Sequence, residues 1–442
     1  MTGATKEALK RRVCDEIDRR SDEIVAISEH VMRNPESGYR EEKTAAFVSE
    51  QLNAIGLQVT TGLALTGVKA RLTGRRSGPT VGVLGELDSL IDPAHQFADP
   101  VTHAAHSCGH NAQIASMLGA GMGLQAVMSE LDGDVVLLAC PAEECIELNY
   151  RLGLREEGRI EFVVGKAELI KAGAFDDVDM VTITHTPSGL DDSLASVGDS
   201  HNGCVIKYVH FRGKSSHAGG FPQRGVNALK AAYLGLSAID AQRETFFEAD
   251  TVRIHPIITK GGDVVSVVPA DVHVEAMIRG RTLEAIEQAS EKFDRSMRAG
   301  ALALGASVEI VTRSGYLSNV PDPNLVALSY ANCAAVVGEE NMGVGRHSTG
   351  STDVGDVSQI MPAVHPRSGG TKGSPHDSDY WVRDHVLAAV NPAKSMAMTV
   401  IDLLHDGAVE AERVTAEAGP KLSREQYLET RRKFDSDEVF GS

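Results

Sequence analysis

Three short apolar runs, separated by segments with helical periodicity, constrain the fold of this chain most strongly. The runs span residues 80–87, 134–140 and 178–184, and their continuous apolar character suits buried strands. A helix pattern rich in small residues spans residues 111–128, between the first two runs, and another spans residues 41–55. Because strands that alternate with helices are typical of layered domains, the sequence predicts an α/β fold.

The pattern changes near residue 200, where a second unit is predicted. Residues 205–211 alternate in polarity as a strand does, and residues 264–278 contain further strands. Residues 226–239 and 283–304 have the pattern of helices. A chain of 442 residues is also too long for one ordinary core. We therefore predict a catalytic α/β domain, formed by residues 1–200 and 313–442, that is split by a smaller α+β domain at residues 201–312.

The charge balance and the cysteines argue against several classes of protein. Asp plus Glu number 61 and Lys plus Arg number 43, a formal net charge of −18, so no nucleic-acid partner is expected. No apolar run approaches the roughly 20 residues of a membrane helix, and the N-terminus lacks an apolar signal-peptide core, so no membrane partner is expected. The six scattered cysteines do not form a disulfide framework. They favour a reducing cytoplasm, where a thiolate is free to bind metal.

Two segments combine ligand-type side chains with a strand-to-helix position. In HSCGHN, Cys108 and His110 flank a glycine that permits a tight backbone, and the segment precedes an expected helix. In PAEE, Glu143 and Glu144 directly follow an expected strand. Two adjacent carboxylates can divide their roles, because one can bind metal while the other accepts a proton.

Two histidines complete the set of candidate ligands. His185 ends the third apolar run, and His376 lies in the turn-rich segment GSPHD. Each feature alone is weak, because a lone histidine at a strand end is usually structural and a Glu-Glu pair usually lies on a surface. All four segments nevertheless follow expected strands or open an expected helix, so their side chains can converge. Cys, His and Glu together suit Zn or Mn, bound as one or two ions.

These motifs, taken together and in order, resemble a known family. HSCGHN, PAEE, His185, SSHAGGFPQRGVNAL, GSTDVGDVS and the late His376 are similar to the aminoacylase and carboxypeptidase family of metallopeptidases, peptidase family M20. The stretch GKAELIKAGAFDDVDMVTITH most resembles the aminobenzoyl-glutamate hydrolase branch. The similarity runs from NPES at Asn34 to about residue 400.

The resemblance implies a fold, a dimer and a set of roles. The inserted domain would be a dimerisation or lid domain, and the protein a homodimer. Glu143 would be the general base, His217 a lid residue that reaches the neighbouring subunit's active site and steadies an oxyanion, and Asp88 the carboxylate that orients a histidine ligand. The metal ligands implied are Cys108, His110, Glu144, His185 and His376.

Four departures from the family pattern concern the expected substrate pocket. Asn111 stands where Asp is common, Ser266 where Asn is frequent and Cys145 where Gly is frequent. A charged insertion at residues 151–159 is expected to lengthen the next loop. These departures leave the metal chemistry intact and leave the substrate open.

Three functions are compatible with these residues. The first is hydrolysis of an amide C–N bond in a small aromatic, carboxylate-bearing substrate, such as an aminobenzoyl compound or an N-acyl amino acid. The second is replacement of an aryl amino group by hydroxyl, as in enzymes that resemble 5-nitroanthranilate aminohydrolase. The third is a non-catalytic binding subunit, which loss of Glu143 or of several ligands would signal. None of these residues is lost.

Overall fold

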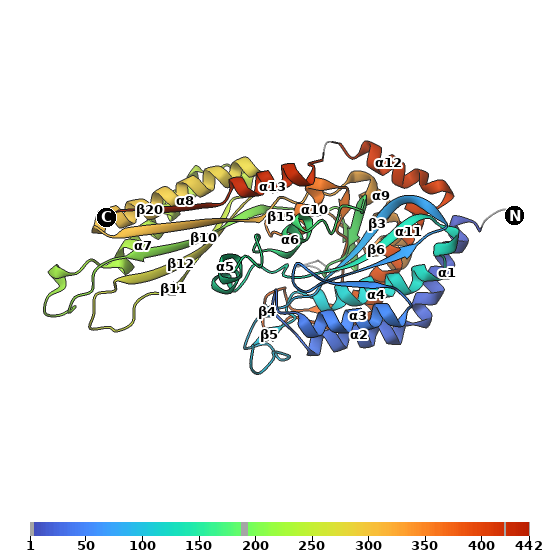
Figure 1. The fold of residues 1–442 in the computed structure, drawn as a ribbon, viewed down its shortest axis with the longest axis horizontal. Helices are drawn as coiled ribbons and strands as arrows, with labels where there is room; N and C mark the ends of the chain where they lie inside the picture. The colour runs from blue at the N-terminus through green and yellow to red at the C-terminus, as the bar shows by residue number, and fades with distance from the viewer. Residues whose placement is uncertain (1–3, 187–192, 420, 442) are drawn as a thin grey trace. The chain divides into compact units, whose positions relative to one another are not determined.

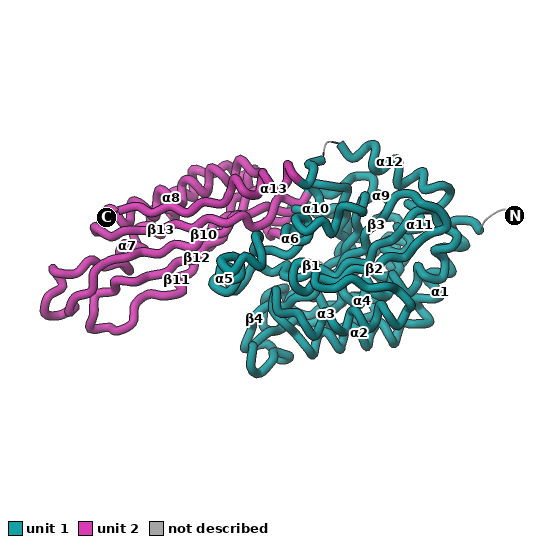
Figure 2. Tube along the Cα trace, viewed as in Figure 1, with its two compact units in different colours: residues 1–200, 320–347, 356–424 teal, residues 201–319, 348–355, 425–442 magenta. Residues whose placement is uncertain are grey.

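A computed structural model describes residues 4–186, 193–419 and 421–441 and divides the chain into two compact units (Figure 2). Each unit has its own apolar core. The prediction of an α/β domain interrupted by a smaller α+β unit is confirmed. Unit 1 comprises Met1–Ser200, Val320–His347 and Asp356–Arg424, and unit 2 comprises His201–Asn319, Ser348–Gly355 and Glu425–Ser442.

Unit 1 is built on a six-stranded sheet whose central strands are parallel (Figure 1). In spatial order its strands are β1 (Val59–Leu63), β2 (Gly67–Thr73), β6 (Asp132–Cys140), β3 (Arg76–Glu86), β7 (Met180–Ile183) and β16 (Ala363–Val364). β3 runs parallel to both β6 and β7, whereas β2 pairs antiparallel with β6 and with β1. The register sets Glu86 opposite Cys140. The carboxyl ends of the parallel strands therefore meet at one edge of the sheet.

Helices cover this sheet, and α4 (His110–Gln125) and α11 (Asn391–Leu404) both contact β3 and β6. α4 is buried along nearly its whole length because its Ala and Gly residues permit close packing. A Cβ at Gly121 would lie only 2.4 Å from Leu137 Cδ1 of β6. The other helices of this part are α1 (Lys6–Arg19), α2 (Ser21–Arg33), α3 (Glu42–Ala54), α5 (Leu148–Glu156), α6 (Gly165–Lys171), α9 (Pro323–Val337), α10 (Val354–Ile360) and α12 (Val409–Glu417).

One helical stretch is long and apolar enough to cross a membrane, which the sequence analysis did not anticipate. A π-helical turn runs directly into α11, so that Val386–Leu404 forms a continuous stretch of 19 residues. Of the most apolar part of this stretch, 78% is buried inside the protein, where the helix contacts α4 and α9. A buried core helix of a globular domain can also have this length and this apolar composition, so the stretch is weak evidence for a membrane span.

Unit 2 is a five-stranded antiparallel sheet with α7 (Ala228–Asp240) and α8 (Leu283–Leu304) packed on it. Its strands are β11 (Arg253–Lys260), β12 (Asp271–Gly280), β10 (Gly203–Arg212), β13 (Ser307–Tyr316) and β20 (Ser436–Phe440), in that order. Alternate residues of β10, such as Val205 and Val209, enter the core with the helices. The residues between them, such as Tyr208 and His210, lie on the other face of the sheet.

Two segments differ from the sequence expectations. The insertion at residues 151–159 does not lengthen a loop, because most of it forms α5, where Arg151 is fully buried and donates to Val163 O at 2.6 Å. The C-terminal segment Glu425–Ser442, which the sequence analysis placed in the catalytic domain, belongs to unit 2. The reason is that β20 pairs antiparallel with β13 along its whole length.

Candidate active site

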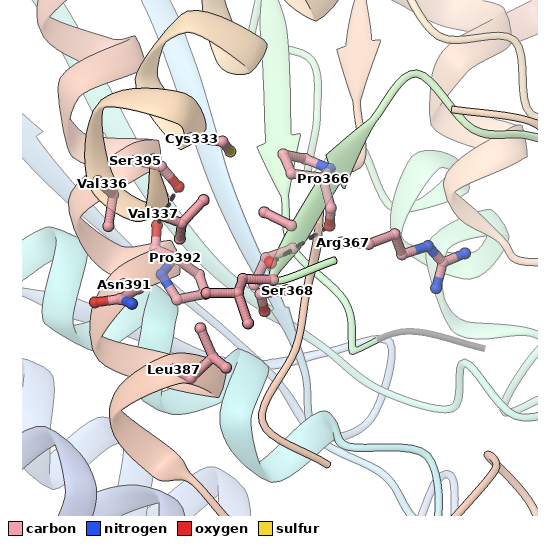
Figure 3. A pocket seen from close by; sticks show the side chains of 13 residues that line it. Cys333, Val336, Val337, Pro366, Arg367, Ser368, Leu387, Asn391, Pro392 and Ser395 are labelled. Carbon is pink, nitrogen blue, oxygen red and sulfur yellow. Dashed lines mark hydrogen bonds between the residues drawn. The ribbon is translucent and has the colours of Figure 1, made fainter. Parts of the chain in front are cut away.

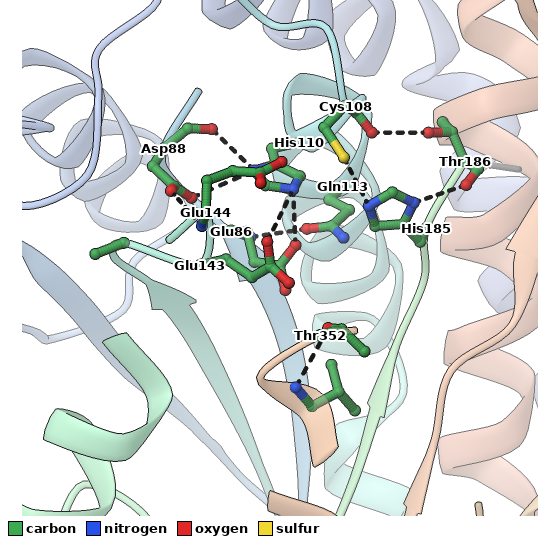
Figure 4. A network of polar contacts seen from close by, with 12 residues as sticks. Glu86, Asp88, Cys108, His110, Gln113, Glu143, Glu144, His185, Thr186 and Thr352 are labelled. Carbon is green, nitrogen blue, oxygen red and sulfur yellow. Dashed lines mark hydrogen bonds and ion pairs between the residues drawn. The ribbon is translucent and has the colours of Figure 1, made fainter. Parts of the chain in front are cut away.

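The carboxyl ends of three parallel strands supply most of the candidate site. Glu86 ends β3, the Glu143-Glu144 pair follows β6, and His185 follows β7. Cys108 and His110 join them at the start of α4. All of these side chains belong to unit 1, and Figure 4 shows them turned toward one another.

The five predicted metal ligands form two groups that share one sulfur atom. The ligand atoms of Cys108, His110 and His185 all lie within 4.8 Å of one another, and so do those of Cys108, Glu144 and His376. Cys108 Sγ is 3.4 Å from His185 Nε2, and Glu144 Oε1 is 3.4 Å from His376 Nε2. The thiol of Cys108 therefore lies between two sets of side chains, which together would hold one or two divalent ions.

Two positions in this arrangement, Gly109 and His376, have a positive backbone φ, which few residues tolerate. Gly109, between Cys108 and His110, has φ +90°, and a Cβ there would lie 2.3 Å from Thr186 Oγ1 and 2.6 Å from Tyr380 Oη. Only glycine fits this position. His376 also has a positive φ, of 72°, and such strain in a non-glycine residue is typical of functional sites.

Partners outside the two groups fix the orientation of the histidines. His110 Nδ1 lies 2.9 Å from Asp88 O and 3.3 Å from Asp88 Oδ1, and His185 Nδ1 lies 2.6 Å from Thr186 O. With Nδ1–H donating to these oxygens, Nε2 of each ring presents its lone pair to the ligand group. Asp88 Oδ2 also accepts from Glu144 N at 2.8 Å. The predicted orienting carboxylate thus lies beside a ligand from each group.

The charges of the site fit a divalent cation. Burial and Glu144 raise the pKa of the Cys108 thiol, but His185 and hydrogen bonds from His110 and His185 bring it down to about 6. Burial also raises the pKa of Glu144, and the charge of His376 outweighs this and lowers it to about 2. Both groups are anionic near neutrality. His110 Nε2 and Glu144 Oε1 are buried and face other charged side chains of the site, Glu86 Oε2 at 3.2 Å and His376 Nε2 at 3.4 Å, so a cation bound among them would satisfy both atoms.

A buried ion pair that was not predicted from the sequence lies beside these ligands. Glu86 Oε1 accepts from Lys166 Nζ at 2.6 Å, and Glu86 Oε2 is 3.2 Å from His110 Nε2, with all three side chains fully buried. Burial raises the pKa of Glu86, but the charges of Lys166, His110 and His185 lower it to about 2. The sequence does contain a signal for Glu86. This carboxylate, in GELD, stands at the end of an expected strand, as the PAEE segment does, and parallel strands bring such ends together.

Glu143 is placed differently from Glu144. Its Oε2 lies 3.9 Å from His110 Nε2, and it shares a group with His110 and Glu86 but belongs to neither group around Cys108. It is 6% exposed. A carboxylate beside the ligands, rather than among them, has the position that a proton acceptor needs.

His217 and Asn111, one of the departures from the family pattern, do not belong to the ligand groups. His217 is exposed in unit 2, and its Nδ1 accepts from the amides of Gly219 and Gly220 at 3.2 and 2.9 Å. Nε2 therefore carries the proton in the neutral ring and can donate it. Asn111 is buried and bonds to Ser28 at 3.1 Å, so it contributes to packing rather than to the site.

A cavity next to Thr184, in the segment that follows β7, is too small for a substrate. It lies between α9, α11 and the residues around Pro366, and its volume of about 10 Å³ admits at most one water-sized group (Figure 3). Its lining is largely apolar. We regard it as a packing defect.

Known proteins share both the sequence and the fold. Residues 201–303 match the model of the peptidase dimerisation domain. The chain is 30% identical to the Xaa-Arg dipeptidase of Mus musculus over 97% of its own length and 96% of that protein. The chain belongs to the M20 peptidase family. The M20 relatives also include one chain of the p-aminobenzoyl-glutamate hydrolase of Escherichia coli, 28% identical over 62% of this chain and 61% of that protein.

Solved structures agree with this assignment. The M20 chain superposes on Bacillus subtilis YXEP, described as a dinuclear metal-binding peptidase of the M20 family, with a TM-score of 0.64 and 20% identity. The match covers 87% of this chain and 98% of that structure. Because its sequence relatives are named as a dipeptidase and a hydrolase, the protein is a hydrolase of the metal-dependent M20 family that acts on C–N bonds, and the non-catalytic alternative is set aside. The inserted dimerisation domain predicted from the sequence is confirmed.

The different positions of the two adjacent glutamates generate a prediction. Glu143→Gln keeps the shape of the side chain but removes its basicity, so turnover should fall by roughly 100- to 10,000-fold while metal content stays near that of the wild type. The matched change Glu144→Gln removes an anionic ligand and should lower metal content as well as turnover. Elemental analysis of both variants after dialysis checks this. Metal lost from the Glu143 variant would make that residue a ligand and contradict the division of roles.

Proposed function

We propose that this protein hydrolyses the amide bond of a small N-acyl amino acid or related compound at a centre of one or two divalent ions, Mn or Zn. One observation supports this most directly: Glu143 Oε2 lies 3.9 Å from Nε2 of His110, a member of one of the two ligand groups that share Cys108. When bound, such an ion acts as a Lewis acid that lowers the pKa of a water molecule from about 15.7 toward about 7.

The residues of the chain then divide the remaining work. The ion ligands are Cys108, His110, Glu144, His185 and His376, and Asp88 orients His110. Glu143 accepts the proton of the attacking water and returns it to the departing nitrogen, which needs it to leave as an amine.

A hydrogen-bond donor must also stabilise the oxyanion that develops on the amide carbonyl. His217 has this capacity, because two glycine amides hold its Nδ1 and leave Nε2–H free to donate. A donor of this kind contributes about 3 kcal/mol to stabilising the transition state. We propose that His217 of one subunit serves the site of its partner, as the family resemblance implies.

Relatives narrow the class of substrate. Their names include indole-3-acetyl-aspartic acid hydrolase, N-acyl-L-amino acid amidohydrolase and p-aminobenzoyl-glutamate hydrolase. Each of these substrates joins an acyl group to an amino acid, so the departing nitrogen carries a carboxylate nearby. Two of the three acyl groups are aromatic. We therefore propose an aromatic acyl group on an amino acid, and none of these names supports hydrolysis of an aryl amine.

A homodimer is proposed through unit 2. β11 lies at one end of the five-stranded sheet and exposes Ile257 and Ile258, and α7 exposes Tyr233 and Leu234. An open edge strand with exposed apolar side chains is a ready template for pairing with a second chain. The matched dimerisation domain covers these residues.

We also propose a reducing compartment, the cytoplasm. All six cysteines are free thiols, and among them Cys108 must remain reduced to act as a ligand.

The products distinguish amide hydrolysis from aryl-amine hydrolysis. Incubation with aminobenzoyl-glutamate, N-acyl amino acids and aminobenzoates should release a free amino acid from an acylated substrate, detected by mass spectrometry. An ammonia assay runs beside it, and the Glu143→Gln variant supplies the blank. Ammonia formed together with a hydroxybenzoate from an aminobenzoate, with no amino acid released from any amide, would contradict the proposal.

The assignment of His217 to the site of a partner generates a second test. His217→Ala and Glu143→Gln subunits, each nearly inactive as homodimers, should regain part of the activity when mixed, because a mixed dimer holds one intact composite site. Subunit exchange is followed separately with two affinity tags. Exchange without recovered activity would show that His217 does not act across the dimer.

A further inference from the structure

A second cluster of ligand-type side chains lies in unit 2 and has no part in the proposed reaction. His210, Asp271 and His273 place ligand atoms within 4.8 Å of one another on the face of the sheet away from its helices. His210 Nε2 is 2.5 Å and His273 Nε2 is 3.1 Å from the same atom, Asp271 Oδ1. Two imidazole nitrogens and one carboxylate oxygen thus converge on a single point.

The register of the sheet builds this cluster. His210 of β10 lies directly opposite His273 of β12, and Asp271 precedes His273 by two residues on the same face. Side chains opposite one another on antiparallel strands have Cβ atoms about 5 Å apart. The three ligands therefore come from neighbouring positions of a rigid sheet and need no loop to bring them together.

Hydrogen bonds also hold two of the ligands, His273 and Asp271, on the side that faces away from the point of convergence, and a carboxylate lies farther from the third. His273 Nδ1 lies 3.0 Å from Tyr208 Oη, and Asp271 Oδ2 accepts from Lys260 Nζ at 2.5 Å. His210 Nδ1 lies 3.9 Å from Glu309 Oε2. Partners of this kind, which fix the ring tautomer and the direction of the lone pair, accompany the ligands of protein metal sites.

We propose that His210, Asp271 and His273 bind a divalent transition-metal ion such as Zn²⁺, separate from the centre around Cys108. Two ligand atoms that are each about 2.0–2.1 Å from a tetrahedral ion lie about 3.4 Å apart, so the histidine nitrogens, now 2.5 and 3.1 Å from Asp271 Oδ1, need to move away from it by less than about 1 Å to admit the ion. The bound ion takes the place of the protons in the hydrogen bonds from His210 Nε2 and His273 Nε2 to Asp271 Oδ1. Both histidine side chains are half-buried, at 17% and 24% exposure, so water can complete the coordination.

The test counts zinc in the full-length protein. Wild-type chain, His210→Gln and His273→Gln are dialysed against buffered Zn²⁺ and analysed by inductively coupled plasma mass spectrometry. His255→Gln is the matched control, because His255 lies on the neighbouring strand β11 and is outside the cluster. Wild type and control should hold one more zinc ion per chain than either cluster variant, while the two cluster variants keep the hydrolase activity of the wild type.

Three results decide against the site. Equal zinc in the cluster variants and the wild type would overturn it, and so would an equal loss in His255→Gln, which would indicate scattered surface histidines. Asp271→Asn guards against misfolded variants, because it keeps the shape of a partly exposed side chain and removes only its charge. This variant should also lose the ion, and its retention at wild-type affinity would contradict the role of the carboxylate.

Discussion

The parallel pairing of β3 with β6 and β7 is the constraint on which the rest of unit 1 depends. Parallel strands end at the same edge of a sheet, so the segments that follow them meet there. The helix α4 starts at that edge and adds Cys108 and His110. Residues as distant in sequence as Glu86 and His185 become neighbours for this reason alone.

Such a concentration of buried charge is costly unless each group has a partner of opposite sign. The structure meets this cost in part with Lys166, which pairs with Glu86 in the core, and with His376, which faces Glu144. The remaining excess of anionic side chains is what a cation would neutralise. The arrangement of anionic side chains that binds an ion therefore lowers the stability of the protein when no ion is bound.

The sequence predicted the elements with strong periodicity and the ligands next to them. β3, β6 and α4 were anticipated to within a few residues, because buried strands and a small-residue helix have distinct patterns. The role of Arg151 was not anticipated, since a charged insertion resembles a surface loop, whereas the structure shows Arg151 as a fully buried residue of α5.

Contacts that depend on pairing register could not be predicted either. The Glu86–Lys166 pair joins a strand to a distant helix, and the cluster of His210, Asp271 and His273 requires the alignment of β10 with β12. Nothing local in the sequence indicates which residue of one strand faces which residue of the next. The same limit explains why β20 was assigned to the wrong unit, since its partner β13 lies more than a hundred residues earlier.

We propose that Cys108 lies between two ions when both groups of ligands are occupied, and anomalous X-ray diffraction tests this most directly. Crystals grown with Mn²⁺ or Zn²⁺ and measured at the absorption edge of that metal should show two peaks in unit 1, about 3.5–4 Å apart. Cys108 Sγ should contact both, with His110 and His185 at one peak and Glu144 and His376 at the other. A single peak away from Cys108, or none at saturating metal, would contradict the account.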